Sequence, residues 1–510
     1  MRLPVRALTA VVLLAGFPVL VLAIIAGLVV LEIEAASHAY VTAIKIGFFA
    51  VPASAVLLKG LAMLAKPPKS APDGLRLPEE RQPELWAFVR GLAEVAGTRP
   101  PDEIYLVSGV EAAVDEETAL FGLRSKCRRL FIGAPLLAGL REDQLAAVLT
   151  HELGHYGNRD TRLAGVTYRG QRSITATISA LDSAKLFQRL LKFVFRHYAK
   201  LYFLVSSAVC RRQERAADEA SARAAGSAAA SSALREVTAI DASWDHFLSS
   251  YAVLGWESGY LPSDVFGGYT ALLAGNHDML EEVRENPPAV SSRYDTHPPL
   301  ATRVAAVERL NLPPAIEHGT GPATTLLREH ATTLDAALLT GLVAEAATKH
   351  RAGWETVVNL GCRSEAVPGA LESLDAAARA IGGEGTVRTY LDALDAGRLT
   401  DLVTTTAQPA VSAGPRARRE FARQDVRKGL STVVDVALAD AGVARWALSW
   451  TGPATFTVDA PHADGLGALL DDAVADEPRT SGLRDRLKHA GADLDRRPGA
   501  HPPAAKTLMR

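Results

Sequence analysis

Residues 151 to 155 have the types and the spacing of a metal-binding motif, His-Glu-Leu-Gly-His. In a helix, positions i and i+4 share one face, one turn apart, so His151 and His155 can bind the same zinc ion. Glu152 projects beside them, where a carboxylate can take a proton from zinc-bound water. The same sequence could belong to a surface helix whose histidines only form hydrogen bonds. Against this alternative, the pair directly follows an amphipathic segment, Asp143 to Thr150, in the same predicted helix. The motif therefore predicts a zinc site with a base beside it.

A catalytic zinc site also needs a third protein ligand and an open fourth position for water. The candidate is Glu214, which lies well downstream on another predicted helix. Asp218 follows one turn later on the same face, where it can orient a ligand histidine or meet the substrate. Taken alone, this segment is typical of solvated helix charges, because Arg211, Arg212 and Arg215 surround it. The histidine pair upstream favours the ligand interpretation.

The elements that must position these residues are predicted from hydrophobic periodicity. Arg141 to Tyr156 is predicted to be a strong helix, with acidic residues in its first turn and Gly157 as a natural terminator. We also expect a helix over Pro83–Ala96, short strands over Ile104–Val107 and Leu130–Ile132, and mostly helix over Ser173–Glu219. The two halves of the predicted zinc site therefore lie on two different helices.

Three segments, taken in order, resemble the membrane zinc endopeptidases of gluzincin type that include the heat-shock protease HtpX and the CAAX prenyl proteases. They are His151–Asp160, Glu214–Asp218, and Asp295–Arg303, which contains Thr-His-Pro and ends in an arginine. The resemblance covers about Leu75 to Leu312. The first segment alone is moderately specific, whereas the three in order are highly specific.

The resemblance implies a role for each residue of the site. His151, His155 and Glu214 would bind one zinc ion per chain, and Glu152 would be the general base. Asp218 would be the accompanying proton donor or an acid that supports a ligand.

His297, in the third segment, has two interpretations that stay open. The resemblance places it near the cleft, as an oxyanion donor or a gating ligand. The residues themselves equally fit the start of a helix, with Thr296 as the cap and Pro298 or Pro299 in the first turn.

The chain departs from the family pattern in the segment before the zinc helix. The family commonly has an Asn-Ala-Phe-Ala edge strand there, against which the substrate lies as an added strand. The comparable stretch is Gly109–Asp115, with Glu in place of Asn and Ala in place of Phe. This difference bears on substrate preference and not on hydrolysis.

A second departure lies between the zinc helix and the third ligand, where many relatives carry further membrane spans. This chain has Arg189, Lys192, Arg196 and Lys200 at steps of three and four residues, which we call the basic stripe. The stripe is compatible with a packed helix that has a solvated basic face, and equally with a helix that lies on anionic lipid. A chamber enclosed entirely within the membrane is not expected.

The N-terminus predicts a membrane hairpin. Ala7 to Leu31 is 25 residues without a charge, which as a helix would measure about 37 Å against a hydrocarbon core of about 30 Å. A second apolar stretch, Ile46 to Ala65, is interrupted only by Lys59. The Lys/Arg bias of the flanking residues places both ends of the hairpin in the cytoplasm.

The alternative for the first stretch is a cleaved signal peptide, since Arg2 and Arg6 precede it and Ala35-Ala36-Ser37 offers small residues. The apolar regions of signal peptides are only about 7–15 residues long, which favours an anchor. Cleavage near Ser37 would make the protein an exported protease.

The composition of the chain excludes some classes of protein. The 510 residues carry a net charge of −2 and three separate cysteines, which argues against nucleic acid as a partner and against a disulfide framework.

We expect a mainly α fold with a small β-sheet. The predicted parts are a transmembrane hairpin (1–66), a linker (67–83), a zinc metallopeptidase domain (84–312), a helical accessory region (315–403), an α+β accessory region (416–494) and a disordered tail (495–510).

Together these features predict a multi-pass protein of the cell membrane with a cytoplasmic catalytic domain. It would act as a zinc endopeptidase on peptides or proteins, membrane proteins among them. The alternative is a catalytically latent zinc-binding membrane scaffold whose C-terminal region binds a partner. The complete set of ligands and base argues against that alternative.

Overall fold

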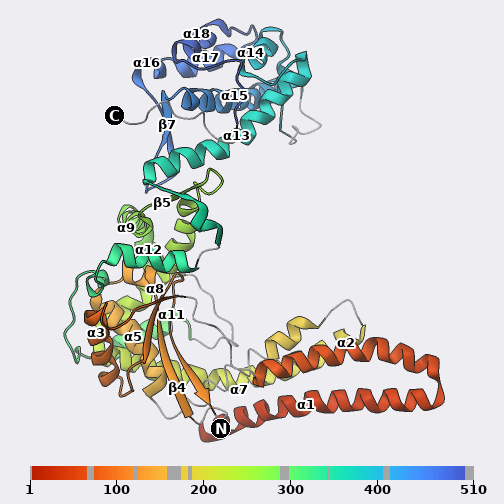
Figure 1. Ribbon diagram of the computed structural model, residues 1–510, viewed down its shortest axis with the longest axis vertical. Helices are drawn as coiled ribbons and strands as arrows, with labels where there is room; N and C mark the ends of the chain where they lie inside the picture. The colour runs from red at the N-terminus through yellow and green to blue at the C-terminus, as the bar shows by residue number, and fades with distance from the viewer. Residues whose placement is uncertain are drawn as a thin grey trace. The chain divides into compact units, whose positions relative to one another are not determined.

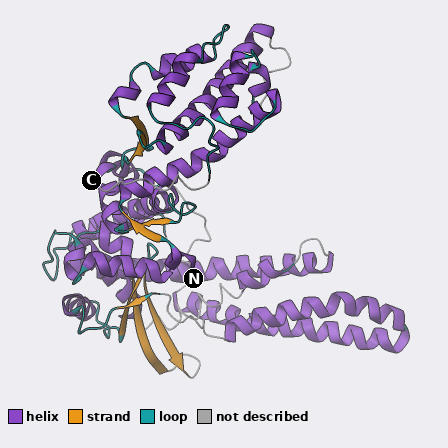
Figure 2. Cartoon of the chain, turned by 45° about the horizontal axis from the view of Figure 1, so that its top comes forward, coloured by secondary structure: helices purple, strands orange, loops and turns teal. Residues whose placement is uncertain are grey.

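The computed structural model describes residues 3–65, 74–119, 124–157, 174–181, 186–287, 298–341, 344–405 and 414–499. The chain divides into two compact units. The first comprises residues 1–243 and 278–342, and the second comprises residues 244–277 and 343–510. As predicted, the fold is mainly α with small β-sheets (Figures 1 and 2). The predicted linker over 67–83 and tail over 495–510 lie partly outside the described residues.

The first unit begins with a long antiparallel helical hairpin (Figure 1). It consists of α1 (Leu3–His38) and α2 (Tyr40–Ala65). Within it, Val12–His38 and Tyr40–Ala62 are long and apolar enough to cross a membrane, judged by length and composition. The two helices pack through small and apolar side chains, including Phe17 and Ala53.

The connection between these two helices is short. Glu32 and Glu34 lie inside the last turns of α1, and only Ala39 separates the helices. The helix continues because glutamate and alanine are good helix formers and no proline or glycine follows Gly27 in α1.

A four-stranded sheet follows, with the strand order β1-β2-β4-β3. Its strands are β1 (Leu75–Arg76), β2 (Glu103–Val107), β3 (Ala112–Ala119) and β4 (Arg124–Gly133). β2 and β4 run parallel, whereas β1 and β3 pair antiparallel at the two edges. Ile104 pairs with Leu130 and Leu106 with Ile132, and all four side chains are fully buried. The two predicted strands are thus confirmed as the centre of the sheet.

The helices of the first unit include those predicted around the zinc motif. α3 (Pro83–Val95) and α5 (Glu142–Gly157) match their predicted ranges closely. α7 (Leu186–Ala225) is one helix of 40 residues, preceded by a helix at 174–180. The others are α4 (Ala134–Gly139), α11 (Leu300–Leu310), η2 (Ala323–Leu326) and α12 (His330–Gly341), while α8 (Ser227–Phe247) and α10 (His277–Glu285) include residues of both units.

The second unit is built on α13 (Trp354–Ile381) and α15 (Pro415–Asp440). Leucine, valine and tyrosine side chains fill its core, with Leu374, Tyr390 and Leu430 fully buried. The remaining helices are η1 (Leu248–Ala252), α9 (Val265–Gly275), η3 (Ala344–Thr348), α14 (Val387–Asp395), η4 (Leu399–Leu402), α16 (Ala460–Ala463), α17 (Leu466–Ala473) and α18 (Ser481–His489). Two small sheets complete it: β5 (Tyr260–Pro262) with β6 (His350–Ala352), and β7 (Ala444–Ala447) with β8 (Thr455–Val458).

Candidate metal centre

α5 carries the two histidines on the side that packs against α7. The apolar side of α5 is formed by Leu145, Leu149 and Leu153, all fully buried. His151 is buried and His155 is half-buried. The helical period that buries the leucines therefore also turns both imidazoles toward the neighbouring helix.

α7 supplies two carboxylates from its second half. Glu214 and Asp218 lie one turn apart and are both buried, whereas Arg215 and Glu219 on the same helix are exposed. The sequence alone left open whether these acids were solvated helix charges. Their burial excludes that interpretation for Glu214 and Asp218.

Close packing of α5 on α7 brings the four side chains together. A Cβ at Gly154 would lie only 3.2 Å from the Cβ of Ala220, so a larger residue would push the helices apart. Ser221 on α7 donates a hydrogen bond to the backbone carbonyl of Ala147 on α5, at 2.8 Å. Gly154 thus allows the two helices to pack closely, and Ser221 links them by a hydrogen bond at a defined position along their axes.

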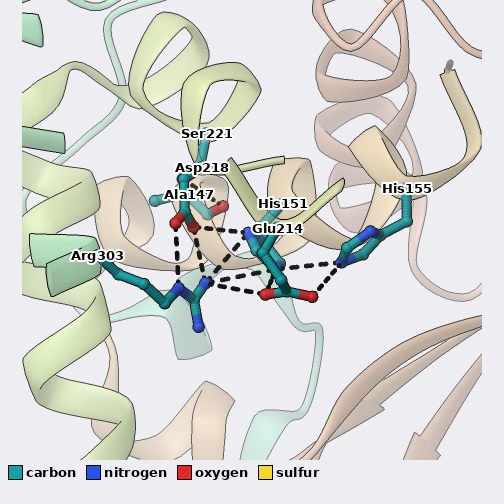
Figure 3. A network of polar contacts seen from close by, with 7 residues as sticks. All are labelled: Ala147, His151, His155, Glu214, Asp218, Ser221 and Arg303. Carbon is teal, nitrogen blue, oxygen red and sulfur yellow. Dashed lines mark hydrogen bonds and ion pairs between the residues drawn. The ribbon is translucent and has the colours of Figure 1, made fainter. Parts of the chain in front are cut away.

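Figure 3 shows His151, His155 and Glu214 turned toward one another. The two Nε2 atoms of the histidines are 3.2 Å apart. Glu214 Oε2 lies 3.7 Å from His151 Nε2, and Glu214 Oε1 lies 3.6 Å from His155 Nε2. Each residue can offer one ligand atom, and the three atoms lie within 4.8 Å of one another.

These separations fit a zinc ion. In a tetrahedral site with bonds of about 2.0–2.1 Å, two ligand atoms lie about 3.3 Å apart. The separation of 3.2 Å between the two histidine nitrogens is close to that value, and each of these nitrogens has an oxygen of Glu214 at 3.6 or 3.7 Å. Two imidazoles and one carboxylate are also a usual ligand set of catalytic zinc sites.

Asp218 lies behind His151, away from Glu214. Its Oδ1 is 3.1 Å from His151 Nδ1. Arg303, on α11, holds the same carboxylate with two hydrogen bonds, from Nη2 to Oδ1 at 2.7 Å and from Nε to Oδ2 at 3.1 Å (Figure 3). A proton on Nδ1 donated to Asp218 leaves the lone pair of Nε2 directed at the ligand cluster.

The electrostatics of this cluster keep Asp218 ionised. Burial raises the pKa of its carboxyl, but hydrogen bonds from His151 and Arg303 outweigh burial and lower the pKa to about 2. Burial lowers the pKa of Arg303, and this is outweighed by its bonds to Asp218 and by the charges of Glu214 and Glu152. Arg303 is therefore a fixed cation beside three acids.

The structure thus brings together five of the six residues singled out from the sequence. Glu152 is half-buried on α5, and its charge is close enough to Arg303 to affect that residue's pKa. His297 lies outside the described residues. Arg303 was noted in the sequence only as the end of the Thr-His-Pro segment. The spacing of that segment gives no sign that its arginine reaches Asp218.

The stretch expected to correspond to the family's edge strand is also an edge strand in the structure. β3 pairs with β4 at one edge of the sheet and lies against α5. Glu111, just before it, and Asp115, within it, are exposed. The strand next to the zinc helix therefore carries acidic side chains.

The comparison with known proteins agrees with this geometry. The model of peptidase family M48 matches residues 79–311, a range that contains strands β2 to β4, α5, Glu214 and Asp218 of α7, and Arg303 of α11. The family match over this range indicates a metallopeptidase, which is a hydrolase of a class that depends on zinc. Residues 79–311 are thus assigned to peptidase family M48. No solved structure matches it.

Proposed function

We propose that this protein is a membrane-anchored zinc endopeptidase whose zinc ion is held by His151, His155 and Glu214. The observation that carries the proposal is the convergence of these three ligand atoms within 4.8 Å at a buried helix interface. Metal-binding groups that are merely solvated do not gather in this way. The match to a metallopeptidase family gives independent support.

The residues of the chain would divide the chemistry between them. When bound, zinc polarises the scissile carbonyl and acidifies a water molecule. Glu152 takes one proton from that water and later gives it to the nitrogen of the leaving peptide, so that it ends the cycle ionised. Asp218 and Arg303 hold His151 in the orientation that presents Nε2 to the metal.

The substrate would lie along the edge of β3 as an added strand. β3 is the last strand in the order of the sheet and pairs with β4, and an edge strand is the place where an extended peptide can add to a sheet. This edge lies against α5, which carries the base. Peptides and proteins, membrane proteins among them, are the proposed substrates, because β-pairing recognises the backbone.

The catalytic unit would lie at the cytoplasmic face of the membrane. This proposal rests on two apolar helices of spanning length and on the Lys/Arg bias at their outer ends. The proposal also requires that the first helix is kept in the mature protein and not removed as a signal peptide. N-terminal sequencing of the mature protein that gave a start near Ser37 would contradict it.

The decisive variant is Glu152→Gln, because it removes the base but leaves the three ligands and the size of the side chain. The purified full chain should keep its zinc and lose casein cleavage by about a thousandfold or more. Glu219→Gln is the matched control, since Glu219 is an exposed glutamate on α7. It should cleave casein at the wild-type rate.

Two results would contradict the proposal. Cleavage of casein by Glu152→Gln at the wild-type rate would show that this mechanism is wrong. Full zinc occupancy of the wild type without turnover on casein or membrane-protein substrates would favour the latent scaffold instead.

A further inference from the structure

The first half of α7 has three distinct sides along its length, at 100° per residue. One side is buried and apolar: Leu191, Phe195, Ala199 and Tyr202 belong to a core shared with the hairpin. The second side is the basic stripe: Arg189, Lys192, Arg196 and Lys200. The third side is exposed and apolar: Leu190, Phe193, Val194, Leu201 and Leu204.

The buried side fastens this part of α7 to the membrane-length helices. The ring of Phe17 on α1 lies 5.9 Å from that of Phe195 and 6.1 Å from that of Tyr198. The Tyr198 hydroxyl donates a hydrogen bond to the carbonyl of Leu13. Both α1 residues lie within the stretch of spanning length, Val12–His38. The start of α7 therefore runs beside the membrane helices (Figure 1).

The exposed apolar side is costly in water. Phe193 is 60% exposed, Leu190 is 59% exposed and Leu204 is 55% exposed. A helix of a soluble protein normally buries such residues or replaces them with polar ones. Beside spanning helices, however, these side chains can contact the acyl chains of lipids, which removes them from water.

The basic stripe lines a hollow. This hollow is open to solvent and has a volume of about 380 Å³. Among the described residues it is bordered by side chains of α7, namely Arg189, Lys192, Phe193, Arg196, His197 and Lys200. Lys192 is held there, because its Nζ donates to the carbonyl of Leu181 at 3.1 Å. Among the residues that the structure describes, no carboxylate pairs with Arg189, Arg196 or Lys200. The hollow thus concentrates positive charge next to an apolar surface.

We propose that the first half of α7 is a binding site for anionic phospholipid, with the lipid phosphate in the basic hollow and the acyl chains on the exposed apolar side. Charge complementarity selects an anionic headgroup, since Lys and Arg at a membrane surface attract anionic lipids. The adjoining apolar side selects a lipid over a free phosphate. Of the two interpretations that the sequence left open for the stripe, the packed structure favours the one with lipid.

The test uses the full chain in nanodiscs of equal parts phosphatidylglycerol and phosphatidylcholine, with the retained lipids counted by native mass spectrometry. The wild type should retain phosphatidylglycerol in clear excess. Each cation at an anionic surface strengthens binding by about fivefold, so Arg189→Gln/Arg196→Gln/Lys200→Gln should lower the preference by at least about tenfold.

Two further variants make the result specific. Arg189→Lys/Arg196→Lys preserves the charge and should keep the preference, which separates loss of binding from loss of folding. Arg416→Gln/Arg418→Gln/Lys428→Gln removes three exposed cations from α15 and should also keep it. The preference should weaken at high salt, because the stripe is solvent-exposed.

Three outcomes would overturn the proposal. The first is equal retention of the two lipids by the wild type, and the second is an unchanged wild-type preference in the triple α7 variant. The third is complete displacement of phosphatidylglycerol by inorganic phosphate at constant ionic strength, which would identify the hollow as a site for free phosphate. None of these readouts depends on peptidase activity.

Discussion

Two buried arginine–aspartate pairs, one in each unit, have nearly the same geometry. In the first unit, Arg303 holds Asp218 with bonds of 2.7 and 3.1 Å. In the second unit, Arg363 holds Asp440 with bonds of 2.6 and 3.1 Å. The side chains of both arginines are mostly buried, at 15% and 4% exposure. The pair alone therefore does not distinguish a functional region from a packing region.

The neighbours of the two pairs differ. Asp218 also contacts His151, and through it the cluster with Glu214 and His155. Arg363 instead donates to the backbone carbonyl of Gly499, near the end of the described chain. The first pair positions a proposed metal ligand, whereas the second fastens a chain segment to a core. A buried ion pair becomes informative about function only when its second partner is a group that can bind or react.

The largest expected effect belongs to the structural pair. Arg363→Ala leaves Asp440 buried without its partner, which should lower the unfolding free energy of the second unit by about 3–5 kcal/mol. Tryptophan fluorescence during urea unfolding can measure this, because five of the six tryptophans lie in that unit. Zinc content should not change. Loss of zinc from this variant would contradict the division of roles.

Arg303→Ala should have the opposite pattern. Without Arg303, Asp218 is held less firmly and orients His151 less well. Zinc affinity should therefore fall by about 10- to 100-fold. The loss of unfolding free energy should be smaller than in Arg363→Ala. Competition with a chromophoric chelator measures the affinity. Arg309→Ala is the matched control, because Arg309 lies on the same helix and, within the described segments, donates only to the carbonyl of Ala305. Equal zinc affinity in both variants would mean that Arg303 has no positioning role.

A half-buried aspartate, Asp435, shows what the arginine partner contributes. In the described part of the chain, Asp435 on α15 has no ion pair, and burial raises its pKa to about 6. The folded state therefore binds a proton more readily than the unfolded state, so this residue costs stability as pH rises from about 4 to about 6. Asp218, with its arginine and histidine, has a pKa of about 2 and contributes stability that is lost only as pH falls toward that value.

The smallest expected effect follows from this contrast. Asp435→Asn should raise the unfolding free energy at neutral pH by about 1–2 kcal/mol, a figure reduced for the partial exposure of the group. At acidic pH the variant and the wild type should be nearly equal, because the wild-type carboxyl is then neutral as well. Urea unfolding at both pH values measures the difference. The same pH dependence in variant and wild type would show that Asp435 does not titrate in this range.

The cluster of proposed ligands could be predicted because it depends on the spacing of residues that are close in the sequence. A spacing of four residues fixes His151 and His155 on one helix face whatever surrounds the helix, and the same rule relates Glu214 to Asp218. The central strands were predictable for the same reason, since short apolar runs mark them.

The rest of the site depends on packing between distant segments. That Arg303 reaches Asp218 follows from how α11 lies against α7, and no local pattern in α11 encodes it. The continuous course of α7, from the hairpin to the zinc ligands, also depends on partners at both ends. The hydrophobic periodicity of the sequence predicted that α7 is a helix. It did not predict which side of the helix packs against other parts of the protein.

The central claim is that Glu214 completes a zinc site with the histidine pair, and zinc analysis of the purified full chain tests it most directly. Wild type and Glu219→Gln should each contain one zinc ion per chain, because Glu219 is exposed and its ion pair is with Arg223 on the same helix. Glu214→Gln should lose the zinc while remaining folded by circular dichroism. A Glu214→Gln protein that still holds one zinc ion per chain would contradict the account.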